Sequence, residues 1–143
     1  MLGVLGVLGG PTALTVLCRR FLCVLCGCVM LVVPREMSAF RRYTLVTIAL
    51  ALASFAEGES ATGIRRRLSP NATFEEGWPA LRRWSRAIAT GRLFRWIRGV
   101  SELAGRRLAE RVSAVLAEAS GVNARSASFE DRVVAGVMSS SSK

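Results

Sequence analysis

Apolar residues recur at helical spacing through the second half of the chain. Between residues 93 and 119 they step by three or four positions, while charged residues keep the same spacing on a different line. The stepping apolar residues are Leu93, Ile97, Val100, Ala104, Leu108, Val112, Val115 and Ala119. This period places apolar side chains on one side of an α-helix and charges on another. The pattern predicts an amphipathic helical region over residues 78–119.

Proline and glycine mark the expected ends of this region. Pro79 suits the first position of a helix, because the N–H that proline lacks has no helical partner there, so a helix is predicted to start near Trp78. Gly91 is the expected break between a short first helix and a longer second one, since glycine costs about 1 kcal/mol in a helix interior. The pair Ser120-Gly121 predicts the end of the second helix.

Residues 120–143 are expected to contain a short helix and a disordered serine-rich tail. Ser128 can cap this helix, with Asp131 three residues later as its partner in a capping box. Phe129, Val133, Val134 and Val137 would form its apolar side. The sequence MSSSSK at the end has low complexity, which is typical of disorder.

The first 36 residues contain two apolar runs that are separated by Arg19 and Arg20. The first run is interrupted by glycines and by Pro11, and the second extends only over residues 21–33. Neither reaches the roughly 20 residues that a membrane-spanning helix needs. We therefore expect residues 1–36 to form a hydrophobic, cysteine-containing extension or a poor membrane anchor.

Residues 37–56 have the parts of a secretory signal peptide in the usual order. Arg41 and Arg42 form a basic start, residues 44–54 form an apolar centre, and small residues follow. This order predicts a signal peptide that is cleaved near Ala56, with Met37 as an alternative translation start. A transmembrane helix is the alternative, but the apolar stretch is short for one.

Residues 57–77 are rich in Gly, Ser, Pro and Asn and carry an arginine cluster, which predicts a flexible basic linker. Asn71-Ala72-Thr73 is a glycosylation sequon that could be used in a secretory lumen. The complete pattern predicts an all-α protein. It would contain hydrophobic N-terminal helices in segments 1–36 and 37–56, the linker 57–77, the amphipathic region 78–119 as one long or two shorter helices, and the short helix in 120–143.

Charge and composition restrict the classes of function. The net charge is +10, and the only lysine is Lys143, so the basic groups are almost all guanidinium groups, which bind phosphate well. Such a chain is expected to bind polyanions, either anionic lipid or nucleic acid. Histidine is absent, which removes the commonest general base and most zinc sites. We expect no enzymatic activity, no cofactor and no small-molecule substrate.

The four cysteines, Cys18, Cys23, Cys26 and Cys28, all lie in the apolar N-terminal part. The CxxC spacing of Cys23 and Cys26 lacks the surrounding pattern of a redox motif and the second ligand pair of a zinc site. The cysteines are interpreted as small apolar residues, with palmitoylation as the alternative.

Six arginines and four aromatic rings, with no acidic residue among them, lie between residues 78 and 98. Guanidinium groups beside bulky rings are typical of a helix that lies in a lipid headgroup layer. The predicted membrane-binding residues are Trp78, Arg82, Arg83, Trp84, Arg86, Arg92, Phe94, Arg95, Trp96 and Arg98. The alternative is a pair of helices whose apolar stripe forms an ordinary core and whose arginines form a solvated face.

Residues 81–99 (LRRWSRAIATGRLFRWIRG) and 104–112 (AGRRLAERV) resemble the arginine-rich amphipathic helices of secreted rhoptry proteins of apicomplexan parasites. The resemblance implies attachment to the cytosolic face of the vacuole membrane around the parasite. The kinase or pseudokinase domain that follows in the best-known members is missing from this sequence, so phosphotransfer is not expected.

Two short matches resemble processing and targeting motifs. The sequence RRLAE, with Arg106, Leu108 and Glu110, is similar to the Arg-x-Leu-x-Glu processing motif of exported apicomplexan proteins. Arg66 and Leu68 match the first half of the same motif, and residues 66–69 also resemble the RxLR host-targeting motif of oomycete secreted effectors.

The leading hypothesis is a secreted, non-enzymatic, effector-like protein that binds anionic membrane lipids, with an unknown host protein as a further partner. One alternative is an integral membrane adaptor that is held by residues 1–56. Another is a basic nucleic-acid-binding protein whose tryptophans stack on bases. Nucleic acid is the less favoured partner, because a secretory signal would separate the protein from it until after delivery.

Overall fold

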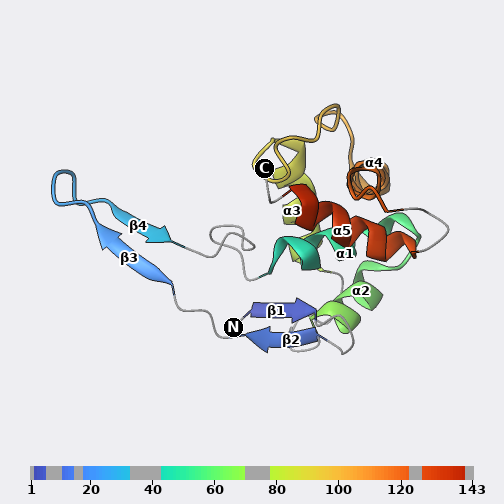
Figure 1. Ribbon diagram of the computed structural model, residues 1–143, viewed down its shortest axis with the longest axis horizontal. Helices are drawn as coiled ribbons and strands as arrows, with labels where there is room; N and C mark the ends of the chain where they lie inside the picture. The colour runs from blue at the N-terminus through green and yellow to red at the C-terminus, as the bar shows by residue number, and fades with distance from the viewer. Residues whose placement is uncertain are drawn as a thin grey trace.

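The computed structural model describes residues 2–5, 11–14, 18–32, 43–69, 78–122 and 127–140. Five helices pack together over residues 45–140, and two separate β-hairpins precede them (Figure 1). The helices are α1 (Leu45–Ala56), α2 (Ala61–Leu68), α3 (Pro79–Ala89), α4 (Gly105–Ala119) and α5 (Phe129–Ser140). The predicted helical character is therefore confirmed for this part of the chain.

The N-terminal part forms hairpins where hydrophobic helices were expected. Strand β1 (Leu2–Leu5) pairs with β2 (Pro11–Leu14), and β3 (Arg19–Leu22) pairs with β4 (Val29–Val32), both antiparallel. The β3–β4 pair is rich in valine, leucine and phenylalanine, several of which favour extended backbone. A tight loop joins its strands, with the Gly27 N–H donating to the Cys23 carbonyl over 2.9 Å. Short apolar runs do not distinguish strands from helices, which explains the error.

Helix α1 lies at the centre of the helical bundle and contacts each of the other four helices. Thr44 caps it, its hydroxyl accepting a hydrogen bond from the Thr47 N–H over 3.1 Å. Residues 48–53 are all buried, and the alanines among them let neighbouring helices approach closely. The apolar centre of the predicted signal peptide is thus the central core element of this fold. Cleavage near Ala56 would remove it.

Helix α2 lies within the segment that was expected to be a flexible linker. Ser60 caps it by accepting a hydrogen bond from the Gly63 N–H over 3.1 Å. Ile64 and Leu68, one helical turn apart, are both buried against the bundle. The glycine and serine that suggested a linker belong to the first turn and cap of this short helix. Asn71 lies outside the described residues.

Residues 78–119 form two helices, but the second starts much later than the spacing predicted. Helix α3 begins at Pro79 and ends shortly before Gly91, as expected. Residues 90–104 then form an irregular loop, and α4 begins only at Gly105. Gly91 and Gly99 have left-handed φ values of 66° and 69°, which stop helix propagation across this loop. Leu93, Ile97 and Val100 are all buried although they lie in this loop. Their helical spacing therefore reflects three separate contacts with the core and not a helix.

The C-terminal helix confirms the local sequence signals. Helix α4 ends at Ala119, directly before the Ser120-Gly121 pair. The capping box at α5 is present: the Asp131 N–H donates to the Ser128 hydroxyl over 3.1 Å, and the Ser128 N–H donates to the Asp131 carboxylate over 3.3 Å. Helix α5 extends to Ser140, so the first serines of the expected disordered tail are helical.

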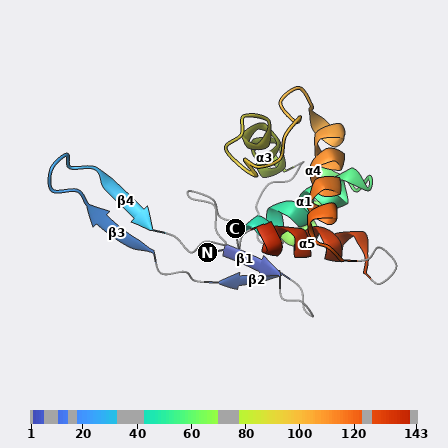
Figure 2. The ribbon, with the colours of Figure 1, turned by 45° about the horizontal axis from the view of Figure 1, so that its top comes forward.

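Helices α1, α4 and α5 pack most extensively on one another, and α3 covers the side of α1 and α4 (Figures 1 and 2). One continuous hydrophobic core includes residues from all five helices and from the loop after α3. The core therefore combines residues from four of the predicted segments, which are 37–56, 57–77, 78–119 and 120–143. None of the helices in the described ranges combines the length and hydropathy that a membrane span needs.

Candidate functional site

The six arginines that were expected to face anions are exposed. Three of them come from α3 and three from the loop that follows it. Together with Trp96 we call them the arginine surface: Arg82, Arg83, Arg86, Arg92, Arg95, Arg98 and Trp96. Both ion pairs among the described residues belong to Arg67, so no carboxylate of the described ranges neutralises the arginine surface. Its guanidinium groups remain available to an external anion.

The aromatic rings of the predicted membrane site divide into two groups. Trp96 is 41% exposed, but Trp78 and Trp84 are each only 2% exposed and Phe94 is also buried. The placement of these last three rings on a membrane-facing surface is therefore wrong. Trp78, Leu81, Trp84 and Ile88 recur at three- and four-residue spacing, so α3 turns them toward the core together.

Tyr43, Trp78 and Trp84 form a compact aromatic cluster between the start of α1 and α3. The ring centroids of Trp78 and Trp84 are 4.8 Å apart at an interplanar angle of 78°, and Tyr43 lies 5.6 Å from Trp78 and 5.1 Å from Trp84. All three pairs are edge-to-face, which is a favourable geometry for aromatic rings. The Tyr43 hydroxyl lies 2.9 Å from the Ser69 hydroxyl. The cluster stabilises the fold and explains why α3 docks with its arginines outward.

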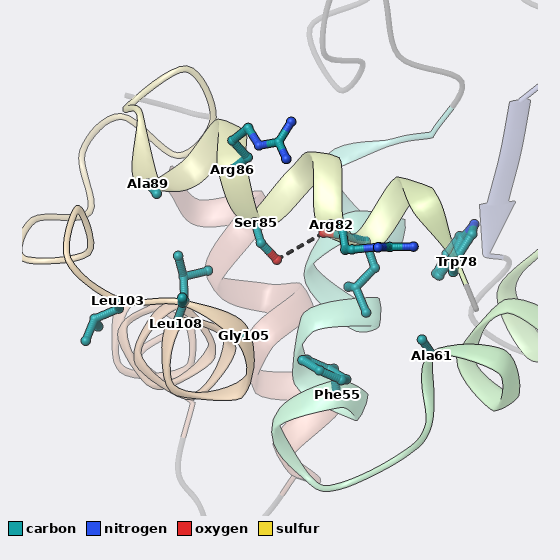
Figure 3. A pocket seen from close by; sticks show the side chains of 12 residues that line it. Phe55, Ala61, Trp78, Arg82, Ser85, Arg86, Ala89, Leu103, Gly105 and Leu108 are labelled. Carbon is teal, nitrogen blue, oxygen red and sulfur yellow. Dashed lines mark hydrogen bonds between the residues drawn. The ribbon is translucent and has the colours of Figure 1, made fainter. Parts of the chain in front are cut away.

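A cavity of about 530 Å³ lies beside α3, between the end of α1 and the start of α4 (Figure 3). Apolar side chains dominate its wall, including Phe55, Leu81, Leu103 and Leu108, and the α3 residues Arg82 and Arg86 also line it. Its size falls within the range of small-ligand sites. An apolar recess beside two cations can accept the apolar part of an amphipathic anion, with the anionic group at the arginines.

Two polar groups near the cavity have local partners. The Ser85 hydroxyl donates to the Leu81 carbonyl over 3.0 Å, so its proton is already used within α3 (Figure 3). The Arg106 guanidinium lies 5.3 Å from the centroid of the Phe55 ring and donates to the Gly58 carbonyl over 3.4 Å. This cation–π contact joins the end of α1 to the first turn of α4. Neither arrangement places a nucleophile beside a base.

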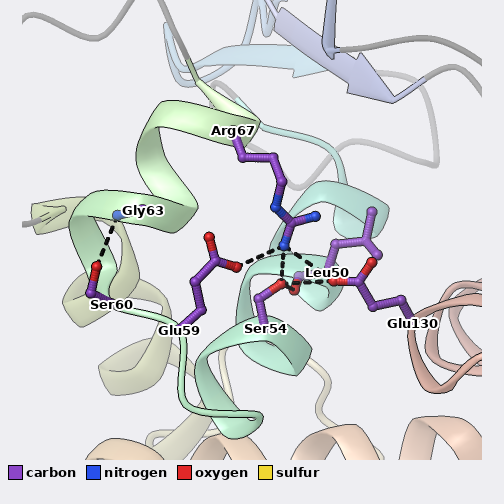
Figure 4. A network of polar contacts seen from close by, with 7 residues as sticks. All are labelled: Leu50, Ser54, Glu59, Ser60, Gly63, Arg67 and Glu130. Carbon is purple, nitrogen blue, oxygen red and sulfur yellow. Dashed lines mark hydrogen bonds and ion pairs between the residues drawn. The ribbon is translucent and has the colours of Figure 1, made fainter.

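Arg67 joins three helices through one polar network (Figure 4). Its Nη2 atom donates to Glu59 over 2.9 Å, to Glu130 over 3.1 Å and to the Ser54 hydroxyl. Partial burial lowers the pKa of Arg67, but the hydrogen bond to Glu59 and the charge of Glu130 outweigh this, so the pKa is raised above its ordinary value. The network connects α2 to α1 and to the first turn of α5, which is a structural role.

The two processing-like motifs lie in helices. Arg66 is exposed on α2 while Leu68 is buried, and on α4 Arg106 and Glu110 are exposed while Leu108 is buried. A protease that recognises Leu68 or Leu108 could bind it only after part of the core has unfolded. Of the cysteines, Cys18, Cys26 and Cys28 are exposed and Cys23 is half-buried, all as free thiols. The described ranges contain no cluster of three potential metal ligands.

Sequence reasoning missed the aromatic cluster and the cavity. The inward direction of the tryptophans could have been inferred, because Trp78 and Trp84 share the spacing of Leu81 and Ile88. The cavity could not, since its wall combines residues of α1, α2, α3 and α4 with residues of the loop before α4. Comparison of the chain with protein-family models, with curated proteins and with solved structures finds no match.

Proposed function

We propose that this chain is a non-enzymatic protein that binds anionic membrane surfaces peripherally through the arginine surface. The observation that supports the proposal best is the exposure of six guanidinium groups on α3 and the following loop, with no described carboxylate paired to them. Trp96, exposed between Arg95 and Arg98, provides an amphipathic ring at the level of lipid headgroups.

Charge supplies most of the expected affinity. Each arginine close to an anionic leaflet contributes about 1 kcal/mol, so six can provide several kcal/mol. Trp78, Trp84 and Phe94 cannot insert without opening the core, so ring burial adds little. Binding should therefore weaken strongly with salt, because the charges are exposed and screened. This differs from an amphipathic helix that sinks into the interface with its whole apolar face.

The cavity adds a feature that a purely electrostatic surface lacks. Arg82 and Arg86 belong both to the arginine surface and to the cavity wall. A lipid phosphate held by these two side chains would have an apolar recess beside it. This arrangement favours lipid over nucleic acid, whose backbone has no comparable apolar part.

Delivery to a host membrane would agree with the resemblance to secreted rhoptry proteins. In that case α1 must stay in the protein, because residues 48–53 form the centre of the core. We therefore propose that the membrane-binding form retains the segment that resembles a signal peptide.

Vesicle co-sedimentation of the full chain tests the proposal. The variant Arg82→Gln/Arg83→Gln/Arg86→Gln should bind vesicles that contain phosphatidylserine about tenfold to a hundredfold more weakly than the unchanged chain. The matched control is Arg66→Gln/Arg107→Gln/Arg111→Gln, which removes three exposed arginines outside the arginine surface and lowers the net charge equally. This control should lose much less affinity.

Three outcomes would overturn the proposal. Equal binding to phosphatidylcholine and phosphatidylserine vesicles would remove the role of charge. An equal loss in both triple variants would show that net charge, not the arginine surface, determines binding. Tighter binding to single-stranded DNA than to anionic vesicles at physiological salt would favour the nucleic-acid alternative.

A further inference from the structure

The β3–β4 hairpin exposes apolar side chains on both of its faces. Neighbouring residues of a strand point to opposite sides, so the cross-strand pairs Phe21–Met30 and Leu22–Val29 lie on different faces. Every one of these four side chains is exposed. At the loop that joins the strands, Val24 and Leu25 are each 93% exposed.

The hairpin projects away from the helices in both views (Figures 1 and 2). No helix covers either face of it in the described part of the chain. A two-stranded hairpin alone is only marginally stable in water, and an apolar surface of this kind usually marks an interaction site. The end of the hairpin is therefore open to a partner on both of its faces.

We infer that the loop of the β3–β4 hairpin inserts into the interfacial layer of an anionic membrane, as a second contact beside the arginine surface. This inference rests on the proposed function, since it assumes that the chain meets a membrane. Both faces and the loop of the hairpin are exposed and apolar, and lipid can surround all of them at once, whereas a protein partner that adds a strand would cover an edge.

The charges of the hairpin agree with an anionic lipid surface. Arg19 and Arg20 are exposed at its open end, and residues 18–32 include no acidic residue. From Arg20 to Val24 the chain can span at most about 13 Å, at about 3.3 Å per residue. With Val24 and Leu25 at the boundary of the hydrocarbon layer, the arginines would lie at or just outside the lipid phosphates.

The backbone limits the depth of insertion. Each strand of a two-stranded hairpin has one edge whose N–H and C=O groups lack a strand partner, and such groups are not tolerated in hydrocarbon. Only the loop residues 24–27 and the side chains next to them can enter the interface. This shallow geometry distinguishes the inference from a membrane-spanning anchor.

The cysteines provide a direct measurement in the full-length protein. Replacing Cys18, Cys23 and Cys28 with Ser leaves Cys26 in the loop for labelling with an environment-sensitive nitrobenzoxadiazole dye. Cys26 is exposed in the loop, so its thiol is accessible to the label. The matched control keeps only Cys18, which is exposed at the open end of the hairpin.

On phosphatidylserine vesicles the dye at Cys26 should shift to the blue and be quenched by lipids with shallow acyl-chain quenchers. The dye at Cys18 should show a much smaller change. A dye at Cys26 that stays in water while the protein is bound to vesicles would overturn the inference.

Variants of the loop test the same contact without a label. Val24→Asp/Leu25→Asp should reduce binding at high salt about tenfold or more, because two apolar side chains no longer enter the interface. The control Val122→Asp/Met138→Asp changes two exposed apolar residues outside the hairpin and should bind like the unchanged chain. Far-UV circular dichroism should show that both variants keep the helical bundle.

The outcomes separate this inference from the proposed function. If the Arg82/Arg83/Arg86 variant loses binding and Val24→Asp/Leu25→Asp does not, the proposed function stands and the inference fails. If only the loop variant loses binding, the arginine surface is not a membrane contact, so the proposed function fails and loop insertion stands as the only membrane contact of the two. Self-association in sedimentation velocity that the loop variant abolishes, without any binding to vesicles, would show that a second copy of the chain covers the hairpin and would overturn the inference.

Discussion

Helix α1 and the β3–β4 hairpin are both short apolar stretches in the first half of the chain, yet their surroundings are opposite. Residues 48–53 of α1 are buried by other helices, whereas most side chains of the hairpin are exposed. Hydropathy alone does not separate the two. Helix α1 is covered because α4 and α5 supply complementary apolar stripes, and the hairpin has no such partner in the described part of the chain. Whether an apolar segment is buried therefore depends on the surfaces that pack against it as well as on its own hydropathy.

Removing α1 should have the largest effect on the stability of the helical bundle. A protein that consists of residues 57–143 should lose cooperative unfolding, because the central element of the core is absent. A protein that lacks only residues 1–32 should keep the bundle and unfold cooperatively. Thermal unfolding followed by far-UV circular dichroism distinguishes the two. A cooperative transition in residues 57–143 would mean that α1 is dispensable, and a mature N-terminus near residue 57 would then agree with the fold.

The same substitution in the two regions should have very different costs. Leu52→Ala in α1 removes a side chain that is 0% exposed and should lower the free energy of unfolding by about 2–5 kcal/mol. Leu25→Ala in the hairpin loop should change it by less than about 0.5 kcal/mol. Urea denaturation of both variants gives the two values. Similar values would show that the hairpin is packed in solution.

A methyl group added between α4 and α5, the two helices that cover α1, should have an intermediate effect on stability. At Gly136 of α5, a Cβ atom would lie 1.8 Å from the Leu116 carbonyl oxygen of α4, so the helices must separate in Gly136→Ala. We expect a loss of about 1–3 kcal/mol in the free energy of unfolding. The control Gly63→Ala in α2 meets only side-chain atoms at 3.1 Å or more and should be neutral or stabilising. An unaffected Gly136→Ala protein would contradict the close packing of α4 on α5.

The smallest effect is expected for the polar network that fixes α2 and α5 to α1. Glu130→Gln should cost about 0–1 kcal/mol, and less at high salt, because the pair with Arg67 is partly exposed. Since the pKa of Arg67 is raised, its contribution to the free energy of unfolding is present below the ordinary arginine pKa. This contribution is lost only as the pH rises through the higher value. Between about pH 6 and pH 9 the contribution of Arg67 should therefore stay constant in urea denaturation. A larger loss than that of Gly136→Ala would make the network a main determinant of the bundle.

Local signals were read correctly from the sequence where a few neighbouring residues decide the outcome. Pro79 at the start of α3, the Ser120-Gly121 pair after α4 and the capping box of Ser128 and Asp131 all occupy their predicted roles. In each case the residues that decide the outcome lie within four positions of one another. Such contacts form in the same way whatever the rest of the chain does.

Predictions failed where one pattern is compatible with two structures. The spacing of Leu93, Ile97 and Val100 suits a helix, but the loop buries the same side chains without one. Trp78 and Trp84 beside arginines suited a membrane surface, although Tyr43, 35 residues before Trp78 in the sequence, packs against both rings. The apolar centre at residues 44–54 forms a largely buried helix, but its role as a signal peptide stays a prediction, because that signal and a buried helix need the same hydropathy.

The sequence by itself determined the helix caps, the end of α4, the basic character of the chain and the exposure of the six arginines, because these depend on local hydrogen bonds and on the cost of burying charge. Only the tertiary structure decided which apolar segments are covered, which rings face the core and where the cavity lies. Those features depend on surfaces from distant segments that must fit one another, and a one-dimensional pattern does not contain that fit.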